Sequence, residues 1–222
     1  MSGALEVCIA DEALLLLPER AIFWPARGAL LIADWHIGKA AVFGRRGLAI
    51  PEGDLQHDMQ RLDRLLSIYA AEELIVLGDL MHAPPLATDH WPQGLANWLA
   101  KHAQLSFSVV AGNHDRISAE QLPAALAGRI DWYPADRRVG AIVLAHEPEP
   151  LADSYVLAGH LHPTLRLTSG VDRVRSPVFW FRQDYAVLPA FGSFTGGHNI
   201  RPGRGDRVFM TGPDSVVEIT PR

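Results

Sequence analysis

Residues 29–36 have the sequence Ala-Leu-Leu-Ile-Ala-Asp-Trp-His, and this stretch decides how the rest of the chain is interpreted. Its apolar part, residues 29–33, predicts a buried strand, and the polar pair Asp34 and His36 follows at once. Four further apolar runs end in the same way: residues 74–77 precede Gly78-Asp79, 107–111 precede Gly112-Asn113-His114-Asp115, 142–145 precede His146, and 155–158 precede Gly159-His160-Leu161-His162. Ligands bind at the carboxyl ends of strands in layered α/β sheets, so we expect the five motifs to meet at one edge.

Helical and strand-like stretches alternate along the remaining chain. Apolar residues recur at helical spacing over residues 52–71 and 91–104, and residues 118–127 predict a short helix that ends before Gly128. Short strands are predicted at residues 5–9, 14–17, 21–24, 178–181, 185–188, 208–210 and 216–219, and a mobile loop at residues 203–205. This pattern predicts an α/β layered fold, and because no repeat or linker interrupts it, residues 1–222 are expected to form one domain.

The composition is that of a globular protein with a hydrophobic core. The 222 residues are 48% hydrophobic and 20% charged. The longest apolar run near the start, residues 13–17, is too short to cross a bilayer, and no signal-peptide pattern is present, so no membrane association is expected. Cys8 is the only cysteine, which excludes an internal disulfide. These features predict a cytoplasmic location.

The side chains that follow the five runs are of the types that bind metals. They comprise two aspartates, one asparagine and four histidines: Asp34, His36, Asp79, Asn113, His146, His160 and His162. On an extended chain residues i and i+2 point to the same side, which would bring Asp34 beside His36 and His160 beside His162. Seven donors are too many for one cation but suit two that share a carboxylate. A nitrogen-rich set favours manganese, iron, cobalt or zinc over magnesium.

Each motif taken alone also has an ordinary structural explanation. An Asp-x-His pair is common, Gly-Asp and Asn-His-Asp form turns, and a single histidine such as His146 often lies in a core or at the surface. Gly78, Gly112 and Gly159 suit turns too, although they would also let the backbone pass close to a metal. The joint order, with each motif directly after an apolar run, favours the metal site.

The ordered series Asp34-x-His36, Gly78-Asp79, Gly112-Asn113-His114-Asp115, His146 and Gly159-His160-x-His162 resembles the calcineurin-like metallophosphoesterase superfamily over residues 29–163. The resemblance implies an α/β fold in which two packed mixed β-sheets are flanked by helices. It also implies that Asp34, His36, Asp79 and His162 hold one metal, and that Asp79, Asn113, His146 and His160 hold the other, with Asp79 bridging. Ala145 stands where glycine usually precedes the lone histidine, a change that leaves the ligand intact.

A narrower resemblance extends over nearly the whole chain. Residues 16–20, 33–39, 78–82, 146–148, 159–163 and 189–197 are similar to the bacterial ligase-associated DNA damage response endonucleases, although Trp35 stands where leucine is more usual. Members of this family depend on manganese and are encoded beside an ATP-dependent DNA ligase and a helicase. The resemblance therefore implies two Mn²⁺ ions, a DNA substrate, a role in DNA repair and a functional association with such a ligase and helicase.

In the predicted reaction a hydroxide held between the metals attacks phosphorus, and further residues are predicted to assist it. His114 is placed to protonate the leaving oxygen, and Asp115 to fix the tautomer of His114 and raise its pKa, unless Asp115 caps the following helix instead. His82 and Lys39 are candidates for contacts with substrate phosphate, although His82 equally suits a plain surface position. The segment from Gly192 to Gly197 is expected either to place backbone beside the metals or to form a simple turn.

The uneven charge of the chain bears on the substrate. The net charge is −5, yet residues 165–207 carry seven arginines against three aspartates. Such a stretch either follows a phosphate backbone or is a solvated arginine-rich surface. The leading prediction is a DNA phosphodiesterase, an endonuclease with an open site, because the core leaves no residues for a cap domain. The alternatives are a phosphatase or phosphodiesterase of a small nucleotide or metabolite, and a metal-free interaction scaffold.

Overall fold

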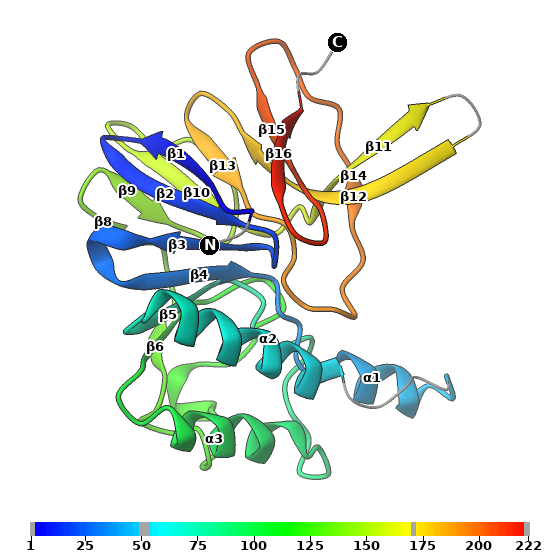
Figure 1. Cartoon of the computed structure of the whole chain (residues 1–222). Coiled ribbons are helices and arrows are strands. Elements are labelled where there is room, and N and C mark those ends of the chain that lie inside the picture. Colours follow the sequence, from blue (N-terminus) through cyan, green and yellow to red (C-terminus); the bar gives the residue numbers. More distant parts are fainter. Residues whose placement is uncertain (1–2, 49–53, 170–171, 220–222) are drawn as a thin grey trace.

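The computed structural model describes residues 3–48, 54–169 and 172–219, in which two packed β-sheets carry helices on one side (Figure 1). The strands of the first sheet follow one another in sequence order: β1 (Leu5–Ile9), β2 (Glu12–Leu17), β3 (Ala21–Trp24), β4 (Ala29–Ala33), β5 (Glu73–Leu77), β6 (Ser106–Val110) and β7 (Asp131–Tyr133). Strands β1 to β4 pair antiparallel, whereas β4 to β7 pair parallel. The carboxyl ends of β4, β5 and β6 therefore lie at the same edge.

The described helices are α1 (Lys39–Arg45), α2 (Asp54–Tyr69) and α3 (Trp91–Lys101), with 3-10 turns at Pro25–Arg27 and Ala119–Gln121. Helices α2 and α3 cover the outer face of the first sheet (Figure 1). Side chains alternate along β4, so Leu30 and Ile32 pack in the same core as Leu62 of α2 and Leu95 of α3. None of the described helices is long and apolar enough to span a membrane.

The second sheet is built from the chain after Tyr133. Its strand order is β14 (His198–Asn199), β11 (Pro163–Ser169), β12 (Asp172–Phe181), β13 (Tyr185–Val187), β10 (Tyr155–Ala158), β9 (Ile142–Leu144) and β8 (Arg137–Val139), and β15 (Arg207–Thr211) and β16 (Val216–Ile219) extend it from β12. Strands β9, β10 and β13 run parallel, whereas β11 and β12 form an antiparallel pair. The sheet is therefore mixed, like the first.

The two sheets share a core. Leu31 and Leu77 of the first sheet lie in one buried cluster with Leu157, Phe179 and Leu188 from the second half of the chain. Burying a side chain of this size stabilises the fold by roughly 1.5–3 kcal/mol. This packing fixes the ends of β4, β5 and β6 against those of β9 and β10, and the expected α/β fold of two packed mixed sheets flanked by helices is confirmed.

Several sequence predictions need correction. The helix expected at residues 118–127 is wrong: only Ala119–Gln121 is helical, because Pro123 forces Leu122 into an extended conformation with ψ 141°. Helix α1 and strand β11 were not predicted, since the first is short and glycine-containing and the second begins at a proline. Residues 203–205 form a hydrogen-bonded turn with Asp206, and their mobility stays a prediction. The predicted helix at 52–71 begins in residues outside those described.

Candidate metal centre

The seven predicted metal ligands meet at the edge where β4, β5, β6, β9 and β10 end. Two aspartates connect these ends: the Asp34 carboxylate accepts the backbone N–H of His160 at 3.0 and 2.9 Å, and Asp79 Oδ1 accepts that of His114 at 2.8 Å. The backbone N–H of Asp34 donates to Gly78 O at 3.1 Å. We call the following seven residues the donor rim: Asp34, His36, Asp79, Asn113, His146, His160 and His162.

The donor rim is not built on extended backbone, as the sequence analysis expected. Five of its residues have left-handed φ values: 53° for Asp34, 53° for His36, 50° for Asp79, 70° for His160 and 44° for His162. The side chains of Asp34 and His36, and of His160 and His162, therefore converge because the chain turns, and the explanation from strand alternation is wrong. Such conformations cost on the order of 1–3 kcal/mol each and persist at functional sites where surrounding contacts hold them.

Asp34, His36, Asp79 and His162 form the first group of the donor rim. Their potential ligand atoms all lie within 4.8 Å of one another. His36 Nε2 is 3.5 Å from Asp79 Oδ2 and 3.3 Å from His162 Nε2, and His162 Nε2 is 3.4 Å from Asp34 Oδ1. Three of the four residues are buried, so this group lies at the bottom of the site.

Asn113, His146 and His160 form the second group together with Asp79. His146 Nε2 lies 2.9 Å from Asn113 Oδ1, 3.0 Å from His160 Nδ1 and 3.6 Å from Asp79 Oδ1. Asn113 is exposed and His160 is half-buried, so the second group opens toward solvent. Asp79 approaches the first group with Oδ2 and the second with Oδ1, which is the arrangement that a bridging carboxylate requires.

Glycine is required at three positions around the donor rim. A Cβ at Gly78, where φ is 77°, would lie 1.8 Å from His146 Nδ1. A Cβ at Gly112 would lie 2.3 Å from Asp79 Oδ1, and one at Gly159 would lie 2.7 Å from Asp34 Oδ2. The prediction that these glycines let backbone pass close to the site is confirmed.

Burial and neighbouring charges together set the pKa values of the donor rim. It raises the pKa of Asp79, against the opposing effects of His146 and of the His114 N–H. Burial, followed by the nearby His162 and His114, lowers the pKa of His36 to about 2, so this imidazole is neutral. The pKa of His162 is raised even though burial opposes it, because Asp34 accepts its hydrogen bond and attracts its proton. A cation bound here would compete with that proton.

The chemistry of the donors fits divalent cations. Asp34 and Asp79 are 0% and 2% exposed, and a buried carboxylate without a cationic partner costs several kcal/mol. The facing imidazole nitrogens, 3.3 Å apart for His36 and His162, would repel through their lone pairs unless a proton or a cation lies between them. His146 Nδ1 is also buried without a hydrogen-bond partner. Residues of this kind at these spacings can hold manganese, iron, cobalt or zinc.

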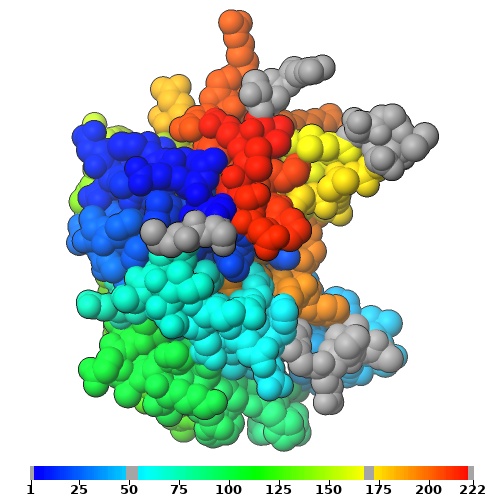
Figure 2. All heavy atoms as spheres, viewed as in Figure 1, coloured from blue at the N-terminus to red at the C-terminus, as the bar shows by residue number. Residues whose placement is uncertain are grey.

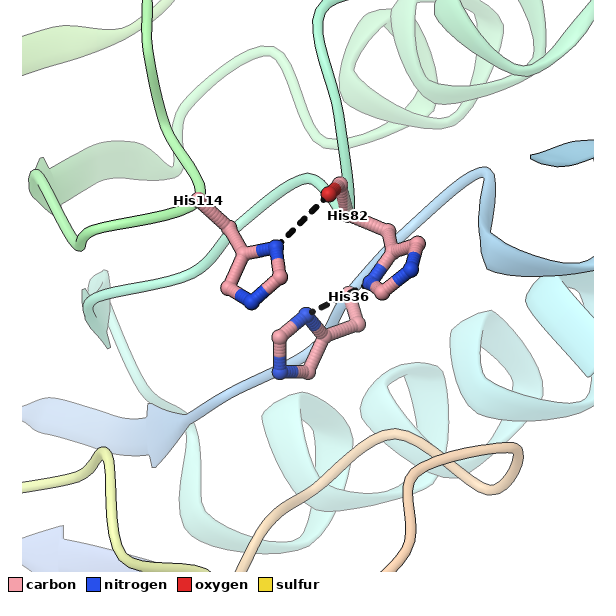
Figure 3. A group of neighbouring side chains, drawn as sticks. All are labelled: His36, His82 and His114. Carbon is pink, nitrogen blue, oxygen red and sulfur yellow. Dashed lines mark hydrogen bonds between the residues drawn. The ribbon is translucent and has the colours of Figure 1, made fainter.

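A second histidine cluster adjoins the first group (Figure 3). His82 Nδ1 lies 3.4 Å from His36 Nδ1, and the rings of His82 and His114 stack with centroids 4.9 Å apart. His114 Nδ1 donates to the carbonyl oxygen of His82 at 2.8 Å, which leaves Nε2 available. Burial, followed by the charge of Lys39, lowers the pKa of His82 to about 4. The structure thus places His114, His82 and Lys39 beside the donor rim, and their contacts with substrate stay predictions.

In the described part of the chain no hydrogen bond joins the side chains of Asp115 and His114, so the predicted tautomer-fixing interaction is wrong. Its carboxylate accepts the backbone N–H groups of Leu80 at 3.1 Å, Met81 at 2.9 Å and Gly112 at 2.9 Å. The aspartate therefore holds the turn after β5 against the turn after β6, and no α-helix follows for it to cap. Burial, despite these hydrogen bonds, raises the pKa of Asp115 to about 6.

The sequence analysis missed a buried ion pair behind the site. Arg61 Nη1 on α2 donates to Asp58 Oδ1 at 2.9 Å and to the carbonyl oxygen of Phe191 at 3.0 Å, and its guanidinium lies 4.1 Å from the centre of the Phe191 ring. Asp58 Oδ2 accepts the Ser193 N–H at 3.1 Å. Charged residues on the apolar side of a predicted helix were the available signal.

This ion pair holds the segment that follows β13 against the donor rim. The N–H of Phe191 donates to Ala33 O at 2.8 Å, and that of Gly192 to Asp34 O at 3.3 Å. The N–H of Thr195 donates to Gly192 O at 3.0 Å, which closes a turn. Both expectations for residues 192–197 therefore apply, since the segment forms a turn and lies beside the first group.

Comparison with known proteins identifies relatives of the chain. A family model described as calcineurin-like phosphoesterase matches residues 29–206. The crystal structure of Pseudomonas putida nuclease MPE superimposes with a TM-score of 0.82 at 36% sequence identity, and the match covers 97% of this chain and 100% of that one. A search of curated proteins found no match.

Two more solved structures match less well. Yfce, a phosphoesterase from E. coli, has a TM-score of 0.45 and 16% identity over 86% of this chain and 97% of its own. The protein AQ665 from Aquifex aeolicus has a TM-score of 0.40 and 18% identity over 60% of this chain and 78% of its own. We draw nothing from these two matches.

Proposed function

The chain belongs to the calcineurin-like phosphoesterase family and is a metal-dependent phosphoesterase, and from this we propose that it is a two-metal phosphodiesterase that cleaves DNA internally. One observation carries the proposal: seven donors form two adjoining groups, and Asp79 faces both of them. The similarity to a nuclease along nearly its whole length supports a polynucleotide substrate. We propose manganese as the native metal, on the resemblance and the nitrogen-rich donors.

The residues of the donor rim have separate tasks in this proposal. Asp34, His36, Asp79 and His162 would hold one cation, and Asp79, Asn113, His146 and His160 the other. When bound, two divalent cations lower the pKa of water to generate a nucleophile and offset the charge that develops on the phosphate oxygens. The exposed position of Asn113 and the half-buried position of His160 leave the second group accessible to a phosphodiester in a long chain.

His114 would act on the leaving group. Its Nδ1 donates to the carbonyl oxygen of His82, so in the protonated imidazole Nε2 carries the transferable proton. Protonation of a leaving alkoxide by a positioned side chain contributes about 10²–10⁴-fold to the rate. His82 and Lys39, on the same side of the rim, would bind a non-bridging phosphate oxygen. Asp115 would position His114 indirectly, because it holds the turns that carry His82 and His114.

A small nucleotide or metabolite is the second candidate substrate, because nothing in the donor rim itself requires a polymer. The accessibility of the second group favours the polymer. We further propose a role in DNA repair in the cytoplasm and a functional association with an ATP-dependent DNA ligase and a helicase. These proposals rest on the resemblance described above.

Cleavage of closed circular single-stranded DNA tests the proposed function. We expect the wild-type protein with Mn²⁺ to linearise the circle and to hydrolyse a generic aryl phosphodiester. Asp79→Ala should do neither. Asp131→Ala, which removes an exposed carboxylate from the start of β7, at the other end of that strand from the rim, should do both. Hydrolysis of the aryl ester with an intact circle would overturn the endonuclease proposal and favour a small substrate.

A further inference from the structure

The antiparallel pair β11–β12 forms an arm that begins next to the donor rim. Strand β11 starts at Pro163, one residue after the rim residue His162, and the outer part of the pair projects beyond the other strands of the second sheet (Figure 1). In the space-filling view the described part of the arm, in yellow, lies at the margin of the molecule (Figure 2). The chain leaves the metal site directly along this arm.

One face of the arm carries arginines only a few residues apart. Arg166 of β11 lies directly opposite Arg175 of β12 in the strand register. Arg173 is two residues from Arg175 and so lies on the same face. All three arginines are exposed. Like charges directly opposite each other destabilise a strand pair, so the opposed Arg166 and Arg175 repel each other in the isolated protein.

Two arginines of the arginine-rich stretch pair with acidic residues, whereas two on the arm do not. Arg182 Nε pairs with Asp206 Oδ1 at 3.2 Å, and Arg207 Nε pairs with Glu218 Oε1 at 2.8 Å. Among the residues that the structure describes, Arg166 and Arg173 make neither a hydrogen bond nor an ion pair. The arm therefore displays two unpaired arginines, and Arg201 and Arg204, which lie outside the arm, are likewise exposed without a partner among the described residues.

A short chain of contacts connects the arginine face to the metal centre. Arg175 Nε donates to Thr164 Oγ1 at 2.9 Å, and its Nη2 donates to the carbonyl oxygen of Gly197. The neighbouring residue Gly196 forms a backbone hydrogen bond with the imidazole of His162. His198, on the other side of Gly197, donates its N–H to His162 O at 2.9 Å. The arginine face thus begins beside a residue of the donor rim.

We infer that the arginine face of the arm, formed by Arg166, Arg173 and Arg175, binds the sugar–phosphate backbone of the DNA strand that the donor rim cleaves. The inference rests on the proposed function. Guanidinium groups bind phosphates through planar, paired hydrogen bonds, and a polyanion removes the repulsion between the opposed arginines. The groups that this face offers to DNA are the exposed arginines, so it contacts the backbone and does not select bases. The arm would therefore lower KM for a polymer without altering the chemical step.

Steady-state kinetics on DNA and on an aryl phosphodiester, each over a series of salt concentrations, test the inference. The test variant is Arg166→Gln/Arg173→Gln. The matched control is Lys101→Gln/Arg138→Gln, which removes the same charge from exposed positions on α3 and β8. Each lost phosphate contact reduces the slope of log(kcat/KM) against log[salt] by about 0.7–0.9. We expect the test variant to have a slope smaller by about 1.4–1.8 and a KM for DNA about tenfold higher at low salt.

The outcomes distinguish a failure of the inference about the arm from a failure of the proposed nuclease function. The inference predicts that both double variants keep wild-type hydrolysis of the aryl ester and that only the test variant loses salt dependence on DNA. Equal slopes for the wild type and the test variant, with DNA still cleaved, would overturn the inference and leave the nuclease proposal in place. A wild-type protein that hydrolyses the ester but not DNA would overturn the nuclease proposal itself.

Discussion

The donor rim and the arginine arm meet between His162 and Pro163, yet they differ in burial, backbone and charge. The rim places two buried carboxylates among imidazoles, on backbone that repeatedly adopts left-handed φ values. The arm is a regular antiparallel pair with exposed arginines on one face. A site that must orient donors within tenths of an ångström needs the support of a packed core, whereas a surface that follows a flexible polyanion needs only charge and reach. The difference suggests that the rim determines the rate and the arm determines the affinity for polymer.

Replacement of His114 should give the largest effect that distinguishes chemistry from binding. Because an alkoxide leaving group needs a proton, we expect His114→Asn to lower kcat on DNA by about 10²–10⁴-fold. An aryl ester, whose leaving group is stable as an anion, should lose much less. The measurement is kcat for both substrates, with His57→Asn, at an exposed position of helix α2, as the control. A loss that is equal for the two substrates would argue against proton donation by His114.

The buried ion pair of α2 should support the rim through stability. Arg61→Met leaves Asp58 buried and unpaired, which costs about 3–5 kcal/mol of unfolding free energy. Arg64→Met, an exposed position on the same helix, should change it by less than about 0.5 kcal/mol. Urea unfolding of both variants measures the difference. Similar small changes in the two would show that the ion pair does not hold residues 191–193 in place.

A single methyl group at Gly78 should damage the rim and spare the arm. The new Cβ would displace His146, and misplacing a catalytic group by about 1 Å costs on the order of 10²-fold in rate. Gly44→Ala is the control, because among the described residues no atom beyond its own helix and chain neighbours lies within 4 Å of a Cβ there. We expect Gly78→Ala to lose activity on both substrates while the salt dependence on DNA persists. Wild-type activity in Gly78→Ala would contradict the described packing of His146.

Asp115 should make the metal-free protein less stable as the pH rises from about 4.5 to 6.5. Its folded pKa of about 6 exceeds the ordinary value of 3.8, so in this window the folded state binds the proton more tightly than the unfolded state. Its contribution is fully present below the ordinary pKa and is lost as the pH rises through 6, and about 2 kcal/mol of that loss falls between pH 4.5 and 6.5. Asp115→Asn cannot titrate at this position. Between about pH 4.5 and 6.5 the unfolding free energy of the chelator-treated wild type should fall relative to that of this variant. Parallel dependence of the two unfolding free energies on pH would contradict the raised pKa of Asp115.

Much of the fold was predictable because each strand that leads to the rim is a short apolar run bounded by polar residues. Residues 29–33 and 155–158, for example, form β4 and β10 with the predicted bounds. The donors were predictable for the same reason, since each follows such a run. The backbone geometry was not, because left-handed φ values at Asp34 or His162 depend on the contacts of the folded chain.

The arm and the buried ion pair of α2 were harder to predict, because the sequence patterns of both also occur in loops or on solvated helix surfaces. Residues 163–169 alternate polar and apolar residues as strands do, but they begin at a proline, and proline weakens the strand signal. The arginines form one charged face only because β12 places Arg175 opposite Arg166. Asp58 and Arg61 lie three residues apart, a spacing that is also common on solvated helix faces. Only the packing of α2 against Phe191 reveals their burial.

The stoichiometry of metal binding tests the central claim most directly. Chelator-treated protein would be titrated with Mn²⁺ in a calorimeter, beside Asn113→Ala and the surface control Asp131→Ala. If the donor rim is two groups joined by Asp79, the wild type and the control should bind two ions per chain, and Asn113→Ala should weaken one of them. A single ion per chain in the wild type, unaffected by loss of Asn113, would contradict the two-metal account.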